Sequence, residues 1–186
     1  MNVRRSTIAL LRPAALLFVA LLATVAIETP AQASPPYDAA AVMFAQMMIP
    51  HHQQAVLISQ WALKQSTNPT VKKLAARIIS EQSPEVAQMK KWVPTKAMTG
   101  MSGMDHQMSM PGMVTTADLA KLSAAIGKKF DGLYLVNMTL HHQGAIAMAT
   151  PLNTSKNPEV AALTKAIVMG QRAEIAEMHR IMVTGK

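Results

Sequence analysis

The chain contains no cysteine. Its absence excludes thiolate metal sites and thiol redox chemistry, and it suits an oxidising compartment, where a stray thiol would react. Aromatic residues make up only 4% of the chain, which is few for stacking on nucleic-acid bases. Because the lysines are evenly scattered, we interpret the formal net charge of +8 as a solvated surface and expect no nucleic-acid partner.

Signals for strands and for common catalytic arrangements are also missing. The sequence shows no Ser/His/Asp order, no phosphate-binding loop and no nucleophile elbow. It contains no Glu-x-x-His motif, which the di-iron carboxylate bundles require. We therefore expect a binding protein and not an enzyme. Two alternatives stay open, a ferritin-like metal oxidase and a structural helical module whose methionines scavenge oxidant.

The N-terminus has the features of a secretory signal over residues 1–33. Arg4 and Arg5 form a basic start, and the unbroken apolar run over residues 14–27 is shorter than the ~20 residues of a membrane span. The small-x-small pattern of residues 31–33 predicts cleavage after Ala33. We expect residues 34–186 to form one domain in the periplasm or outside the cell, with no stable membrane span after cleavage.

An internal repeat organises this domain. FAQMMIPHHQQAVLIS from Phe44 aligns with YLVNMTLHHQGAIAMA from Tyr134. NPTVKKLAARIISEQSPEVAQM from Asn68 then aligns with NPEVAALTKAIVMGQRAEIAEM from Asn157. The alignment predicts repeat one over residues 38–93 and repeat two over residues 116–183, joined by a Met-rich linker over residues 94–115.

Each repeat is predicted to be a helical hairpin. We place helices at residues 38–66, 69–92, 117–150 and 158–183. Asn68-Pro69 and Asn157-Pro158 suit an N-cap followed by the first helical position, so they begin the second helix of each hairpin. Two hairpins that share one core predict an all-α fold, a four-helix bundle of ferritin-like type.

Helical spacing assigns the repeated polar residues to faces. His51 and His141 point into the bundle, each one turn from an inward methionine, whereas His52 and His142 lie about 100° round on the flank. In the third helix Thr139 and Gln143 are expected to face outward. The second helix of each hairpin carries Gln, Glu and Met on its core face, namely Gln82, Glu85 and Met89, and Gln171, Glu174 and Met178.

An inward glutamate needs a partner, and an inward histidine can supply one. We expect Glu85 and Glu174 to contact histidines across each hairpin and to orient their rings, as carboxylates do around metal ligands. Inward histidines and methionines can also be plain core residues. Duplication of the whole set favours a functional role. The candidate ligands in the bundle are Met48, His51, His52, Met89, Met138, His141, His142, Met148 and Met178.

The linker concentrates methionine where a core role is not expected. Its glycines, serines and prolines lack apolar periodicity, so we assign it no packing role. Thioether sulfur selects Cu(I), with silver similar, and imidazole extends the range to Cu(II). The candidate copper ligands here are Met98, Met101, Met104, His106, Met108, Met110 and Met113. The alternatives are a disordered Met-rich linker and a sacrificial oxidant trap.

Three motifs together resemble the domain-of-unknown-function 305 family over about residues 38–183. They are M-x-x-H-H-Q-x-A, the N-P turn and Q-x-x-E-[VI]-x-x-M, each present twice. The resemblance implies an exported, ferritin-like helical bundle linked to copper binding and copper resistance. The resemblance also implies a role in copper binding for the repeated residues, which are Met48, His51, His52, Glu85, Met89, Met138, His141, His142, Glu174 and Met178.

The second copy departs from the first at two positions. Pro84 stands before Glu85, where it is expected to bend the helix, and Asn137 stands where the first copy has Met47. The segment from Met101 to Met113 is also similar to Met/His segments of periplasmic copper-resistance oxidases and copper-tolerance proteins. The sequence thus predicts a periplasmic protein that sequesters copper, chiefly Cu(I), or hands it to another periplasmic copper protein.

Overall fold

The computed structural model describes residues 36–94 and 110–186. All regular secondary structure in these ranges is helical, which confirms the all-α prediction. None of the described helices is both long and apolar enough to cross a membrane. The predicted signal and the Met-rich part of the linker, residues 95–109, lie outside the described residues. The elements are α1 (Ala39–Gln65), α2 (Pro69–Lys90), α4 (Thr116–Ala124), α5 (Gly127–Ala149), the 3-10 turn η3 (Thr150–Leu152) and α6 (Pro158–Thr184).

The helix starts follow from local capping. The Asn68 side chain accepts from the backbone amides of Thr70 and Val71, at 2.8 and 3.4 Å, and Pro69 takes the first helical position. Asn157 does the same at the start of α6, at 3.0 and 3.3 Å. The two Asn-Pro predictions are therefore confirmed, and the side-chain oxygen satisfies amides that a helix start leaves unpaired.

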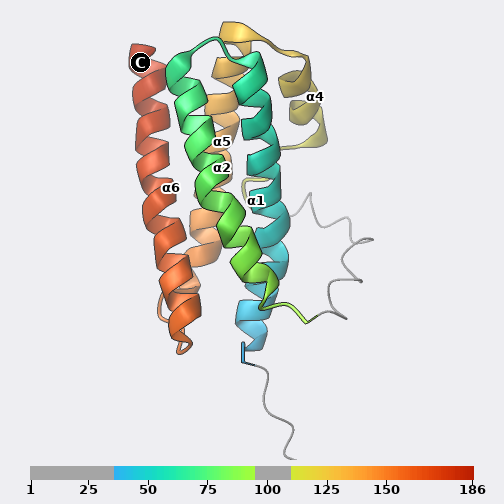
Figure 1. Ribbon diagram of the computed structural model, residues 1–186, viewed down its shortest axis with the longest axis vertical. Coiled ribbons are helices and arrows are strands. Elements are labelled where there is room, and N and C mark those ends of the chain that lie inside the picture. The colour runs from blue at the N-terminus through green and yellow to red at the C-terminus, as the bar shows by residue number, and fades with distance from the viewer. Residues whose placement is uncertain (1–35, 95–109) are drawn as a thin grey trace, which may run out of the picture. The chain divides into compact units, whose positions relative to one another are not determined.

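The four long helices lie side by side (Figure 1). α1 packs along α2, and α5 packs along α6. α1 also contacts α5, and α2 contacts α6. Each of these helices therefore has two neighbours, so two of its faces are covered.

The prediction of one helix over residues 117–150 is wrong, because the structure has two helices there. α4 ends at Ala124, the backbone is extended at Ala125 and Ile126, and α5 begins at Gly127 with a positive φ of 55°. The Gln65 amide of α1 donates to the carbonyls of Leu122, Ser123 and Ala125, at 3.3, 2.8 and 2.9 Å. These bonds satisfy carbonyls at the end of α4, so a side chain from α1 stabilises the break.

The inward row predicted for α1, Phe44, Met48, His51, Ala55, Ile58 and Ala62, is wholly buried. Thr139 on α5 was expected to face outward, yet it is buried. Its hydroxyl donates to the Leu135 carbonyl at 2.8 Å and lies 3.3 Å from the sulfur of Met178. A hydroxyl satisfied in this way is tolerated on a covered face, which spacing alone does not reveal.

A polar layer divides the core. The first hydrophobic cluster holds Ala55, Ile78, Met138 and Met178, and the second holds Met48, Val86, Ala145 and Val168. On each long helix the residues between these clusters are buried and polar: His51 and His52, Gln82, His141 and His142, and Gln171 and Glu174. Buried polar groups are costly unless they are paired. The layer is therefore where a functional site is expected.

Candidate metal site

The four repeated histidines all lie in the polar layer, fully buried. His51 of α1 and His141 of α5 meet face to face, with ring centroids 3.7 Å apart and planes inclined by 36°. Each ring is more distant from its chain neighbour, at 6.4 Å for His52 and 6.3 Å for His142. Contact between α1 and α5 thus joins one histidine from each hairpin.

The histidines predicted on the flank are buried too. His52 Nε2 lies 2.9 Å from a carboxylate oxygen of Glu85, and His142 Nε2 lies 2.8 Å from one of Glu174. Contacts between Glu and His across each hairpin are therefore present, but the second histidine of each pair makes them, not the inward one. The reason is that successive residues of a helix project about 100° apart, and α1 and α5 each contact two neighbouring helices, so both histidines of a pair are covered.

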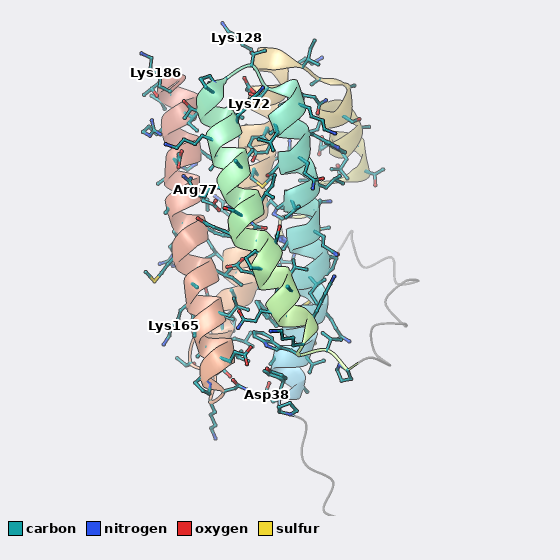
Figure 2. All side chains as sticks on the ribbon, viewed as in Figure 1. Asp38, Lys72, Arg77, Lys128, Lys165 and Lys186 are labelled. Atoms are coloured by element: carbon teal, nitrogen blue, oxygen red, sulfur yellow. The ribbon has the colours of Figure 1, made fainter. Side chains whose placement is uncertain are left out.

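The second carboxylate also faces a guanidinium. Arg77 extends from α2 towards α6 (Figure 2), with Nε 3.7 Å from Glu174 Oε1, and it pairs with Glu177. The position in the second copy that is equivalent to Arg77 is Ala166. Glu85 therefore has no arginine equivalent to the one that faces Glu174. Glu174 is therefore held between a histidine and an arginine, whereas Glu85 contacts His52. Pro84 lies within α2, and Glu85 still reaches its histidine.

The inner imidazoles are neutral. Burial, helped by the neighbouring His52, lowers the pKa of His51 to about 3, although the bond to the Pro111 carbonyl acts in the opposite direction. Burial and the adjacent His51 lower the pKa of His141 well below its usual value. Neutral imidazole is the form that binds metal ions, because the lone pair is free of a proton.

Several nitrogen and oxygen atoms of the layer have no hydrogen-bond partner among the described residues. They are Nδ1 of His51, His52 and His142, both ring nitrogens of His141, both amide atoms of Gln82 and Gln171, and Oε1 of Glu174. A buried polar atom without a partner costs about 1–3 kcal/mol, and this number of such atoms in one layer requires an explanation. One explanation is that these atoms are donors for a ligand.

Sulfur lies on both sides of the layer. Met48 and Met89 belong to one hydrophobic cluster, and Met138 and Met178 to the other, all with no exposed surface. Met148 is only half-buried. Across the described ranges, no three His, Asp or Glu side chains are grouped so as to hold a metal ion. The layer and the clusters beside it contain imidazole nitrogen and thioether sulfur, and such donors fit a soft ion.

The described end of the linker packs onto this layer. Residues 110–114, here called the strap, follow the linker's Met-rich part, and Met110 and Val114 are buried while Met113 is half-buried. The strap backbone reaches the layer directly, because the Pro111 carbonyl lies 3.1 Å from His51 Nε2. The expectation that the linker has no packing role is thus wrong for the strap. Met98, Met101, Met104, His106 and Met108 lie outside the described residues.

Two residues that the sequence analysis missed hold the strap. The Gln54 amide donates to the Val114 carbonyl at 3.0 Å and accepts from its amide at 2.8 Å. On α5, a Cβ at Gly144 would lie 1.9 Å from the Pro111 carbonyl oxygen, so only glycine leaves room. Gln54 and Gly144 are equivalent positions of the two copies. This difference, two residues after each histidine pair, is the sequence signal that could have identified them.

Residues 41–182 match the family described as "Domain of unknown function (DUF305)". The chain is similar to a DUF305 protein from Streptomyces coelicolor, with 31% identity, 77% of this chain and 92% of that chain covered, and a TM-score of 0.67. It is also similar to a DUF305 fragment from Deinococcus radiodurans, with 34% identity, 79% of this chain and 97% of that chain covered, and a TM-score of 0.66.

The chain is also similar to CopM in the Cu(II)-bound form, at 35% identity, with 75% of this chain and 93% of that chain covered and a TM-score of 0.64. CopM has further structures in Cu(I)-bound, silver-bound and metal-free forms. A curated relative, uncharacterized protein L153 of Acanthamoeba polyphaga mimivirus, is 40% identical over 42 residues. That match spans 23% of this chain and 28% of the viral protein.

Proposed function

This chain belongs to the DUF305 family, and we propose that it is an exported copper-binding protein that sequesters copper or hands it on. The observation that carries the proposal is the contact between His51 and His141, two neutral buried imidazoles with thioether sulfurs in the clusters on either side. A soft ion suits that donor set. The CopM structures with copper and silver, in the same family and at similar length, support the choice of metal.

The proposed ligands follow the two copies of the repeat. Met48, His51 and Met89 would serve one ion, and Met138, His141 and Met178 another. Met148 is a further candidate beside the second set. His52 and His142 would complete the layer, each oriented by its glutamate. Thioether donors favour Cu(I), imidazole also accepts Cu(II), and silver is expected to mimic Cu(I).

The linker would capture ions before they reach the layer. Its methionines outside the described residues, with His106, form a soft donor set that needs no deprotonation. The strap follows this segment in the chain and contacts His51, so a described part of the linker reaches the layer. Cleavage after Ala33 and residence in the periplasm or outside the cell are part of the proposal, as is a second periplasmic copper protein as recipient.

The finer architecture is likewise proposed. We infer a ferritin-like four-helix bundle that arose by duplication of a hairpin. Support comes from the paired contacts α1–α2 and α5–α6, from the matching Asn caps, and from a Glu–His pair across each hairpin. The departures at Arg77 and at Gln54/Gly144 are then later changes in one copy.

A competition titration tests the proposal. Mature protein, residues 34–186, would be titrated with Cu(I) against a chelator of known affinity under anaerobic conditions. We expect at least one ion bound more tightly than micromolar. A protein that leaves all Cu(I) with a micromolar chelator is not a copper sequestering protein. Iron loading followed by oxygen uptake separates the oxidase alternative, which predicts oxygen consumption.

A further inference from the structure

The strap contacts the site on a face where the two copies of the repeat differ. Gln54 binds both backbone groups of Val114, and Gly144 leaves space for the Pro111 carbonyl. Gly112 completes the fit, because its φ of 79° is in the left-handed region and a Cβ there would lie 2.5 Å from the Leu140 carbonyl oxygen. The strap therefore has a built seat formed by both α1 and α5.

This seat determines the tautomer of His51. A backbone carbonyl can only accept a hydrogen bond, so the contact of 3.1 Å requires Nε2 of His51 to carry the proton. A neutral imidazole has one N–H, hence Nδ1 keeps the lone pair. That Nδ1 is buried and has no partner in the described part of the chain.

The flanking histidines, His52 and His142, have the same tautomer as His51. Glu85 and Glu174 accept at Nε2 of His52 and His142, which leaves Nδ1 of each ring buried and unpartnered in the ranges that the structure covers. Three of the four rings thus direct Nε2 to a fixed acceptor. Metal-binding histidines usually donate their other N–H in this way, to a carboxylate or a backbone carbonyl.

We propose that the seated strap fixes the proton of His51 on Nε2 and thereby makes Nδ1 of His51 the atom that binds a soft monovalent ion. Pro111 and Gln54 are then positioning residues for the metal site. The ligand part of this proposal rests on the proposed function, whereas the tautomer part does not.

The two copies are unequal in consequence. Within residues 36–94 and 110–186, neither ring nitrogen of His141 has a hydrogen-bond partner. Burial lowers the pKa of His141, and the His51 backbone lies close enough to act in the opposite direction but does not meet hydrogen-bonding geometry. The tautomer of His141 is therefore less firmly set than that of His51. His51 is preorganised by the strap, and preorganisation lowers the cost of binding. Within the layer, His51 therefore binds metal before His141.

Long-range proton–nitrogen NMR spectra of metal-free protein with ¹⁵N-labelled histidine test the tautomer. Such spectra separate a protonated ring nitrogen from one with a lone pair, and His51→Gln assigns the signals. We expect His51 to show a protonated Nε2 and an unprotonated Nδ1. A proton on Nδ1 of His51 would overturn the proposal.

Matched variants show whether the strap is the cause. Gly144→Ala places a methyl group where the Pro111 carbonyl lies, whereas Gly132→Ala, in the same helix, meets nothing within 4 Å. We expect Gly144→Ala to move the Nε2 signal of His51 towards the unprotonated position and Gly132→Ala to leave it unchanged. Gln54→Ala, with exposed Gln60→Ala as control, repeats the test should Gly144→Ala unfold. If neither strap variant moves the signal while helicity is retained, the strap does not set the tautomer.

Silver ion, a diamagnetic probe, tests the binding atom. As Ag(I) is added, we expect Nδ1 of His51 to shift before either nitrogen of His141. A shift at Nε2, or first at His141, would contradict the proposal. If Ag(I) and Cu(I) both fail to bind, the ligand part falls together with the proposed function, and the spectra of metal-free protein still decide the tautomer.

Discussion

The imidazole rings of His51 and His141 lie 3.7 Å apart between centroids, although they belong to different hairpins and to α1 and α5. We expect the double substitution His51→Ala with His141→Ala to abolish tight Cu(I) binding in the layer, because it removes both inner nitrogen donors. Chelator competition measures the loss, and circular dichroism measures helicity. The exposed His179→Ala is the matched control and should bind as wild type. Loss of helicity in the double variant would instead favour a purely structural role for these histidines.

Glu85 is expected to support the metal site through His52. Glu85→Ala leaves Nε2 of His52 without its acceptor at 2.9 Å, and loss of such a partner lowers metal affinity by about 10–100-fold. Glu85→Gln should retain most of the affinity, because its amide oxygen still accepts. The Cu(I) affinity of both variants would be measured by competition. Glu81→Ala, one turn away and exposed, is the control, and an equal loss there would remove the argument from the His52 contact.

The copper capacity of the linker can be separated from that of the bundle. Replacing Met98, Met101, Met104 and Met108 by serine removes linker sulfurs while the strap residues Met110 and Met113 stay. We expect fewer Cu(I) ions bound per chain, measured by metal analysis after desalting, with helicity unchanged. Replacing the neighbouring Ser102 and Ser109 by alanine is the control. Unchanged stoichiometry in the methionine variant would show that the linker does not capture copper.

Acid is expected to weaken a group of hydrogen bonds to the Glu159 carboxylate, here called the clamp, which lies away from the candidate metal site. Tyr37, Trp92 and Gln88 all donate to the Glu159 carboxylate, at 2.7, 3.1 and 3.0 Å, and these bonds, that of Tyr37 foremost, lower its pKa. A carboxylate whose folded pKa is lowered stabilises the fold above the unfolded value of 4.5, and this contribution is lost as pH falls through the folded pKa.

Glu159→Gln should therefore be less stable than wild type at neutral pH and should lose less stability on acidification below pH 4.5. Urea denaturation of both proteins across that range measures the difference. Parallel curves for the two proteins would mean that the clamp contributes no charge-dependent stability.

The break between α4 and α5 provides a test of backbone conformation. Gly127 has a φ of 55°, so Gly127→Ala should destabilise the fold by about 1–2 kcal/mol, the cost of a left-handed conformation for a residue with a Cβ. Gly132→Ala lies in the exposed interior of α5 and should stabilise it by about 0.5–1 kcal/mol. Thermal or urea unfolding measures both. A neutral Gly127→Ala would indicate that the junction can relax.

Much of the fold was predictable because it follows from local chemistry. The Asn-Pro starts depend on one side chain and two nearby amides. The buried row of α1 depends on helical spacing. The break before Gly127 was missed because the carbonyls there are satisfied by Gln65, a residue distant in the chain. Thr139 was assigned to the wrong face because its hydroxyl finds partners inside the core.

The candidate site residues could be selected from the repeat, because the duplication of Met, His and Glu is visible in the sequence. The contacts that these residues make with one another could not be predicted from the sequence. Whether His51 or His52 faces a glutamate depends on which neighbour covers each side of α1, and that is a property of helix packing. The seat of the strap likewise exists only where Gln54 and Gly144 meet the same backbone. The chain alone thus indicated the candidate donor types and their helices. Tertiary contacts determined which nitrogen of His51, His52 and His142 is already bonded, because a hydrogen bond requires an acceptor brought close by packing.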